Sequence, residues 1–204
     1  MEQVPVIAFW PSQSRTPPMR KVASGKGYLL MSALIVTESI FGNTLAIAEA
    51  IGDGIADVLG PRLVHLVHAS DAPKQLSAEV DLLVIGAPTH TLSMPNAGTR
   101  ADAVQQGAVI SEHTGVREWI SNVNLPEGIR VATFDTSIPA RQQLGTAARA
   151  AAIALRDRGA RTTVGPSFAV TGMEGPLADG ELGRATAWGR ELAAGSPARA
   201  RGLY

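Results

Sequence analysis

The order of apolar and polar residues along the middle of the chain alternates between two patterns. Short, nearly continuous apolar runs such as Ser32–Val36 are typical of strands buried on both faces. Between them, apolar residues recur about every four positions, as in Leu45–Leu59, which predicts a helix with one buried face. The predicted strands are residues 32–36, 62–67, 81–87, 129–134 and 160–164, and the predicted helices are residues 45–59, 115–122, 145–158 and 179–194.

Strands that alternate with helices predict a parallel sheet with right-handed crossover connections. Five such strands with helices on both faces make a doubly wound α/β domain. Ligands of these domains bind outside the carboxyl ends of the strands, where the strand order reverses. We therefore expect a binding site in the loops after the first, third and fourth predicted strands.

The two ends of the chain lack this pattern. Residues 1–30 are rich in Pro, Ser, Arg and Lys without a sustained period, which predicts a disordered N-terminal extension. An alternative is that translation begins at Met31. Residues 31–195 form the predicted domain, and residues 196–204 a predicted disordered tail.

Composition narrows the possible functions. The chain has no cysteine, which excludes disulfides and cysteine nucleophiles and fits a cytoplasmic protein. It holds 18 basic and 18 acidic residues, but basic residues are in excess at the ends, so the middle is net acidic. Without a basic stripe there we expect no nucleic-acid partner. Without a run of about 20 apolar residues we expect no membrane insertion.

The loop after the first strand carries most of the candidate chemistry. Its residues are Thr37, Glu38, Ser39, Ile40, Phe41, Gly42, Asn43 and Thr44. Backbone N–H groups at the start of the following helix favour an anion, and Gly42 lets the chain turn tightly around one. No Lys or Arg lies in this loop, so hydroxyl and N–H groups would bind a phosphate. The alternative is an ordinary helix cap at Ser39 or Asn43, but four hydroxyl or amide side chains exceed what a cap requires.

The pattern Thr-x-Ser-x-x-Gly-Asn-Thr after a first strand resembles the phosphate loop of flavodoxins, and Phe41 occupies the aromatic position that often precedes the glycine. The resemblance extends over most of residues 32–194. It implies a flavodoxin-like fold of the short-chain form, with strand order 2-1-3-4-5. It also implies flavin mononucleotide (FMN) as the cofactor.

The same resemblance implies that two further loops contact the flavin. The loop after the third strand is similar to the one that packs on the ribityl chain and isoalloxazine ring, and the loop after the fourth would contact the pyrimidine edge of the ring. The cofactor-binding residues expected in them are Pro88, Thr89, His90, Thr91, Phe134, Asp135, Thr136 and Ser137. An Asp135 carboxylate close to the ring would lower the reduction potential. The alternatives are an exposed loop histidine at 90 and an ordinary turn after residue 134.

The sequence departs from familiar flavodoxins in this region. No Trp or Tyr lies between Tyr28 and Trp119 to stack on the ring, and residues 89–94 contain no glycine. Residues 96–113 form a long irregular segment, which could cover the flavin or bind a partner. Arg100 within it is a candidate contact for a nicotinamide phosphate.

Three functions remain open. An FMN-binding carrier that transfers electrons between partner proteins is favoured by the phosphate loop and by the acidic middle region, which would attract basic redox partners. An FMN-dependent oxidoreductase that uses NAD(P)H and a quinone is favoured by the missing stacking aromatics. A flavin-free interaction module is the weaker alternative. We predict no catalytic side chain and no metal site, since His65 and His68 are three apart on a predicted strand and face opposite sides.

Overall fold

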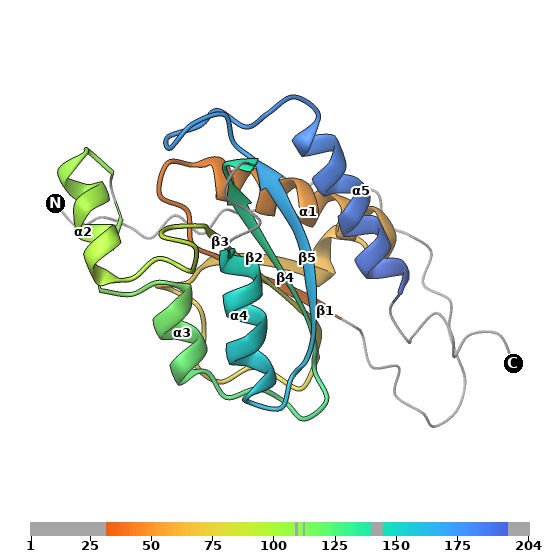
Figure 1. Ribbon diagram of the computed structural model, residues 1–204. Coiled ribbons are helices and arrows are strands. Elements are labelled where there is room, and N and C mark those ends of the chain that lie inside the picture. The colour runs from red at the N-terminus through yellow and green to blue at the C-terminus, as the bar shows by residue number, and fades with distance from the viewer. Residues whose placement is uncertain (1–31, 109, 112, 140–144, 196–204) are drawn as a thin grey trace, which may run out of the picture.

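A computed structural model describes residues 32–108, 110–111, 113–139 and 145–195. Its five strands form one parallel sheet in the order β2-β1-β3-β4-β5 (Figure 1). The strands are β1 (Ser32–Thr37), β2 (Val64–His68), β3 (Val80–Pro88), β4 (Arg130–Ser137) and β5 (Arg161–Ala169). This confirms the predicted doubly wound fold and its strand order. The predicted extension (1–30) and tail (196–204) lie outside the described residues.

The helices cover both faces of the sheet. They are α1 (Asn43–Leu59), α2 (Ala97–Gln105), α3 (Val116–Asn122), α4 (Ala147–Arg156) and α5 (Glu181–Ala194), with a short 3-10 helix η1 (Pro61–Leu63) before β2. α1 and α5 pack on one face, and α3 and α4 on the other (Figure 1). None of these helices has the length and apolar content needed to span a bilayer.

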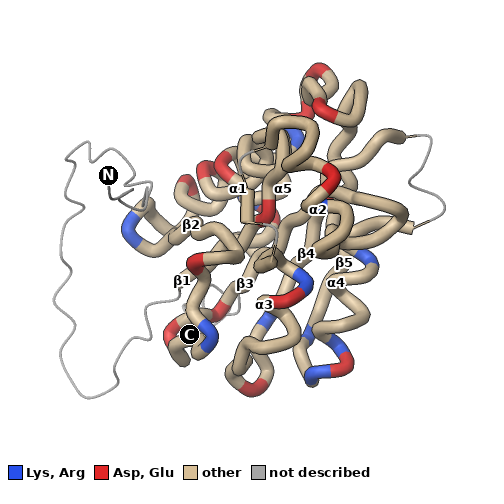
Figure 2. The backbone as a smooth tube through the Cα atoms, turned by 90° about the vertical axis from the view of Figure 1, so that its left-hand side faces the viewer, with Lys and Arg blue, Asp and Glu red and all other residues tan. Residues whose placement is uncertain are grey.

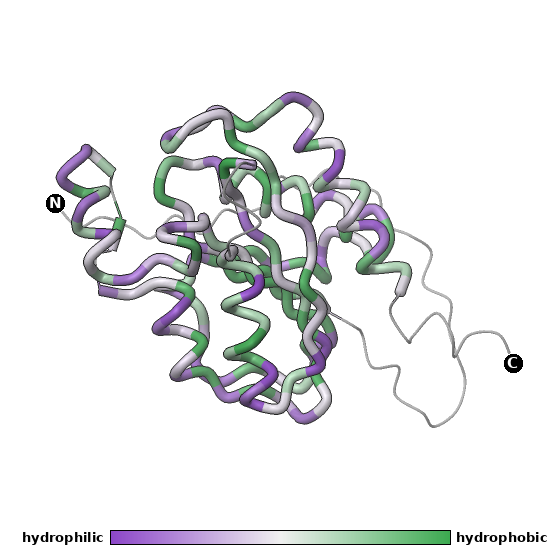
Figure 3. The backbone as a smooth tube through the Cα atoms, viewed as in Figure 1, coloured by the Kyte–Doolittle hydropathy of each residue, from purple (hydrophilic) through white to green (hydrophobic). Residues whose placement is uncertain are grey.

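Each face of the sheet has its own apolar core. The isoleucine stripe of α1 (Ile47, Ile51 and Ile55) is fully buried and packs with Phe134 and Phe168. The opposite core contains Trp119 of α3 and Leu155 of α4. The central strands are apolar along most of their length (Figure 3), whereas acidic and basic residues are interspersed along the described backbone (Figure 2). The regularly spaced apolar residues that predicted this helix are therefore the residues that α1 buries against the sheet.

α1 and α5 approach closely because two glycines face each other. A Cβ atom added at Gly54 of α1 would overlap the carbonyl oxygen of Thr186, and one added at Gly189 of α5 would overlap that of Ile51. Helices can pack backbone to backbone only where no side chain intervenes. The pair of glycines thus fixes the position of α1, and with it the loop that precedes α1.

Three elements differ from the prediction. β4 continues three residues past its predicted end at Phe134, so residues 135–137 lie in the strand and not in a loop after it. β5 runs past Gly165-Pro166 to Ala169, because β5 is an edge strand, where proline costs no ladder hydrogen bond, and the pairing with β4 shifts register there. Part of the segment predicted to be irregular forms α2. That helix has few apolar residues and begins with a capping box, in which Asn96 Oδ1 accepts from the N–H of Thr99 and Thr99 Oγ1 accepts from the N–H of Asn96 (both 3.0 Å).

Candidate functional site

The three predicted loops meet at the carboxyl edge of the sheet. β1, β3 and β4 are neighbours, and their ends are level, since Thr37 pairs with Gly86 and Pro88 pairs with Thr136. Backbone hydrogen bonds between the neighbouring segments continue just beyond these pairs. The N–H of Glu38 donates to the carbonyl of Gly86, and the N–H of Thr89 donates to that of Thr136 (both 2.9 Å). One compact surface is therefore formed by residues up to 100 positions apart in the sequence.

The first turn of α1 is open toward this edge. Gly42 occupies the N-cap position with φ of 87° and has no side chain to cap the helix, and of the first-turn N–H groups that of Leu45 donates to Ser39 Oγ. A Cβ atom at Gly42 would have no atom within 4 Å, so the space beside the turn is free. The N–H groups that begin a helix have no partner within the helix and carry a partial positive charge. This end of α1 can accept an anion.

Hydroxyl groups surround the open turn. Ser39 Oγ accepts from the N–H of Leu45 (3.1 Å), and Thr44 Oγ1 and Thr136 Oγ1 share a hydrogen bond of 2.7 Å. Thr37 is 0% exposed, and its Oγ1 has no hydrogen-bond partner among the described residues. A buried hydroxyl without a partner costs stability unless something binds it. Thr37 Oγ1 is therefore an enclosed hydroxyl in the loop before α1 that no described residue uses.

Asn43 has a different role from the cap considered above. Its side-chain amide donates to the carbonyl of Glu174 (2.8 Å), in the loop between β5 and α5. That loop approaches closely, because a Cβ atom at Gly175 would contact the Asn43 amide. Sequence reasoning missed this fourth loop, although Gly172, Gly175 and Pro176 mark a turn directly after β5. The loop covers one side of the α1 N-terminus.

The loop after β3 is hydrogen-bonded to the start of α4 and then forms a tight turn. Thr89 Oγ1 accepts from the N–H of Ala147 at the start of α4 (2.9 Å). His90 and Ser93 close a tight turn by two backbone hydrogen bonds of 2.9 and 3.0 Å, with Thr91 and Leu92 at φ of 48° and 64°. Positive φ is costly for side chains larger than glycine and is found where a site demands it. Burial lowers the pKa of His90, so its imidazole is neutral at pH 7.

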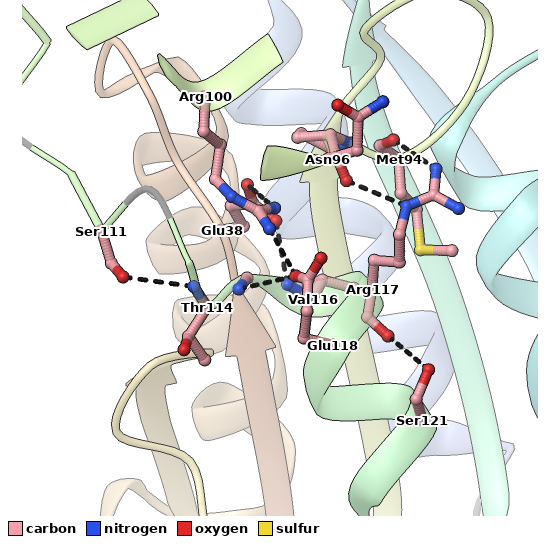
Figure 4. Close-up of polar contacts among 12 residues, drawn as sticks. Glu38, Met94, Asn96, Arg100, Ser111, Thr114, Val116, Arg117, Glu118 and Ser121 are labelled. Atoms are coloured by element: carbon pink, nitrogen blue, oxygen red, sulfur yellow. Dashed lines mark hydrogen bonds and ion pairs between the residues drawn. The ribbon is translucent and has the colours of Figure 1, made fainter. Parts of the chain in front are cut away.

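Arg117 of α3 holds this turn from below, a role that sequence reasoning missed. Its guanidinium donates to the carbonyl of Met94 (2.6 Å), as Figure 4 shows, and also to the carbonyl of Pro95 and to Ser93 Oγ (both 3.1 Å). An arginine near the start of a predicted helix gave no hint of a distant loop contact. The turn is therefore held on the side away from α4 as well.

The four cofactor-binding residues predicted at the fourth strand all lie in the second half of β4 (Arg130–Ser137), and their side chains are divided between the two faces of the sheet. Phe134 lies in the apolar core, edge-on to Phe168 and Trp188 with ring centroids 6.0 and 6.3 Å apart. Thr136 is on the same face and reaches α1 through Thr44. Asp135 and Ser137 are buried toward the other face. Of the four, Thr136 is the one whose side chain directly joins the first loop.

The Asp135 carboxyl lies beneath the start of α4. Its Oδ2 accepts from the N–H of Ala148 (3.2 Å) and from Ser167 Oγ (3.1 Å), and the residue is completely buried. Burial raises the pKa of Asp135, and hydrogen bonds to Thr146, Ala148 and Ser167 oppose that rise. The carboxyl is thus engaged in fixing α4.

We expect Asp135→Asn to stabilise the protein more at pH 8 than at pH 4. Because the folded-state pKa is raised, the native state binds the proton more tightly than the unfolded state does. The contribution of Asp135 to stability is therefore full below its ordinary pKa of 3.8 and is lost as pH rises through the folded value. Asparagine is nearly isosteric and does not titrate. Urea unfolding of both proteins at several pH values measures the difference, and a difference that does not grow with pH would contradict the assignment.

Glu38 and Arg100 form a buried ion pair beside the first loop. Arg100 Nη1 lies 3.2 Å from Glu38 Oε1, and Arg100 Nη2 lies 2.5 Å from Glu118 Oε2 (Figure 4). Glu38 Oε2 also accepts from the N–H of Val116 (2.8 Å). Desolvation raises the pKa of Glu38, against the opposing effects of Val116 and Arg100. Arg100 is 1% exposed, which contradicts the hypothesis that it binds a nicotinamide phosphate.

No protein-family model and no curated protein matches the chain. Solved structures do. A flavodoxin from the domain Archaea is 22% identical with a TM-score of 0.54, and the match covers 80% of this chain and 97% of that one. Oxidised flavodoxin 1 from Bacillus cereus is 17% identical with a TM-score of 0.54, covering 81% and 98%. Oxidised flavodoxin 2 from the same organism is 19% identical with a TM-score of 0.52, covering 80% and 98%. The chain has the flavodoxin-like fold.

Proposed function

We propose that the protein binds FMN at the carboxyl edge of its sheet and carries electrons between partner redox proteins. The observation that carries the proposal is the open first turn of α1, with Gly42 at a left-handed φ and the unpartnered Thr37 hydroxyl beside it. FMN is the cofactor that the resemblance to flavodoxins implies. Its phosphate is an anion that needs N–H and hydroxyl donors, which is the donor set present here.

Each loop has a separate task in this proposal. Thr37, Ser39 and Thr44, with the backbone N–H groups after Gly42, would hold the phosphate. The segment Pro88–Thr91 and the end of β4, Asp135–Ser137, would border the ring. Bound FMN would supply the redox chemistry, since it accepts and releases electrons. The chain's own part is to bind the cofactor, to orient it and to exclude water from one side of it.

The electrostatics of the loops suit a carrier. His90 is neutral at pH 7 because burial lowers its pKa. Asp135 is turned toward α4. The predicted ring-side residues that the structure describes therefore include a neutral imidazole and a carboxyl directed toward α4. The described residues also hold no group of three or more His, Asp or Glu that could bind a metal.

One observation favours a second function, an FMN-dependent NAD(P)H:quinone-type oxidoreductase. Trp119 and Trp188, the tryptophans in the described part of the chain, lie away from the site, and the turn beside the site instead exposes Leu92 (40%). A ring without an aromatic cover leaves a face on which a nicotinamide or quinone could stack. Oxidation of NADPH with added quinone, in the absence of any partner protein, would favour this function over the carrier.

The test is an absorbance titration of the purified protein with FMN, followed by stepwise reduction with dithionite. We expect a shifted flavin spectrum and saturable binding. A protein that does not change the spectrum of added FMN would overturn both functions and leave a flavin-free interaction module.

Thr37→Val is expected to weaken FMN binding without weakening the fold. The substitution keeps the shape of the side chain and removes a hydroxyl that has no hydrogen-bond partner in the described part of the chain. Stability in the absence of ligand should therefore stay equal or rise, while FMN should lose about 1 kcal/mol, roughly fivefold in Kd. Isothermal titration and thermal unfolding measure the two quantities.

Thr163→Val in β5 is the matched control, because Thr163 is exposed and lies near the opposite edge of the sheet. It should change neither the FMN affinity nor the stability. Equal FMN affinity in Thr37→Val and the unsubstituted protein would mean that the phosphate lies elsewhere.

A further inference from the structure

The loop before α1 is attached to α2, a helix that belongs to a distant part of the chain. Arg100 of α2 pairs with Glu38 of the loop, and both side chains are buried. Next to this pair, Ile40 packs in a small apolar cluster with Ala103 and Ala108. The loop and α2 therefore share one polar and one apolar contact.

α3 completes the enclosure of the Glu38 carboxylate. The N–H of Val116 donates to Glu38 Oε2, and Glu118 pairs with the far side of the Arg100 guanidinium (Figure 4). Gly115 leaves the space that this arrangement needs, because a Cβ atom there would overlap Glu38 Oε2 and lie 2.6 Å from Arg100 Nη1. The carboxylate is therefore fixed from two elements and has no room for another orientation.

The position of the Glu38 side chain controls the next residues. The backbone N–H of Glu38 is fixed to the Gly86 carbonyl, so holding its side chain fixes both ends of the residue. Ser39 follows directly and accepts from Leu45 in the first turn of α1. In addition, a carboxylate turned toward that turn would repel a phosphate. The contacts with Arg100 of α2 and Val116 of α3 hold the negative charge between these two helices.

We propose that Arg100 is a positioning residue for phosphate binding. It holds Glu38 so that the residues from Ser39 to Thr44 keep the conformation that accepts the anion, and α2 thereby belongs to the binding site without contacting the ligand. The inference rests on the proposed function. A role of Arg100 in overall stability would affect the binding of the whole ligand, whereas this positioning role affects only the binding of the phosphate.

The experiment compares two ligands, FMN and riboflavin, which differ by the phosphate. Their dissociation constants are measured by fluorescence titration for the unsubstituted protein, Arg100→Met and Glu38→Ala. We expect both variants to lose about tenfold or more in FMN affinity and to bind riboflavin within about twofold of the original. Arg190→Met is the control, because Arg190 forms an exposed ion pair with Asp57 on the outside of α5 and α1. It should change neither constant.

Glu38→Ala decides the result if Arg100→Met does not fold, because Arg100 then retains Glu118. Arg100→Lys, which keeps the charge but cannot reach both glutamates in the same way, should fall between the original and Arg100→Met. Unchanged FMN affinity in a folded Glu38→Ala would overturn the inference, and so would an equal loss for FMN and riboflavin. Failure of the unsubstituted protein to bind FMN would overturn the proposed function, and the inference with it.

Discussion

Gly189→Ala should lower the free energy of unfolding by about 2–3 kcal/mol, although alanine forms helices better than glycine. The added methyl group would overlap the carbonyl oxygen of Ile51 and would lie 3.2 Å from the Cα atom of Gly54. Both are backbone atoms of α1, so the strain can be relieved only by moving α5 away from α1. Chemical unfolding in urea measures the loss.

Gly183→Ala in the same helix is the control for this prediction. A Cβ atom at Gly183 has no atom within 4 Å, so the change adds helix propensity without a clash. We expect it to be neutral or to stabilise by about 0.5 kcal/mol. If the two variants were equally stable, α1 and α5 would not be in backbone contact in solution.

Arg100→Met should lower the stability at pH 7 by about 3–5 kcal/mol, because it leaves Glu38 buried without its cation. The Glu38 side chain is 7% exposed, so water cannot replace the lost partner. The loss should shrink as the pH falls, since protonation removes the uncompensated charge and burial already raises the pKa of Glu38. Urea unfolding at pH 7 and at pH 5 measures both effects.

Two further variants test whether the stability loss in Arg100→Met comes from the uncompensated charge of Glu38 or only from the lost bulk of the arginine side chain. Arg190→Met breaks an exposed ion pair, whose two side chains are 56% and 52% exposed, and should change the stability by less than about 1 kcal/mol. Replacing Glu38 and Arg100 together, both by Met, should recover much of the loss, because apolar side chains need no partner. A double variant as unstable as Arg100→Met would show that the charge is not the cause.

The strands of the sheet and most of its helices could be predicted from the sequence because their signals are local, whereas the strand order came from the resemblance to flavodoxins. β1 and β3 are uninterrupted apolar runs, and the isoleucines of α1 repeat at helical spacing. The same local reading placed the end of β5 too early, at Gly165-Pro166, because a proline stops most strands. It did not reveal that this strand lies at the edge of the sheet, where the residue is tolerated.

The candidate site could be predicted only in part. The glycine and hydroxyl residues at the start of α1 are close in sequence, so their grouping was visible. The partners of Glu38 and Asn43 lie 62 and 131 residues away, and no local pattern reveals such distances. α2 escaped prediction for another reason, since a helix stabilised by a capping box and by one buried arginine has no apolar stripe.

The hydrogen bond between Thr44 and Thr136 has a consequence for how the protein is made. It joins residues 92 positions apart, across strands that are all parallel, so it can form only after β4 has been synthesised. Contacts of this separation form slowly, because a long loop must close before they are gained. During translation the first turn of α1 leaves the ribosome early and then waits for more than 90 residues before its partner appears. The start of α1 and the end of β4 are therefore brought together only after a long stretch of chain between them has been synthesised.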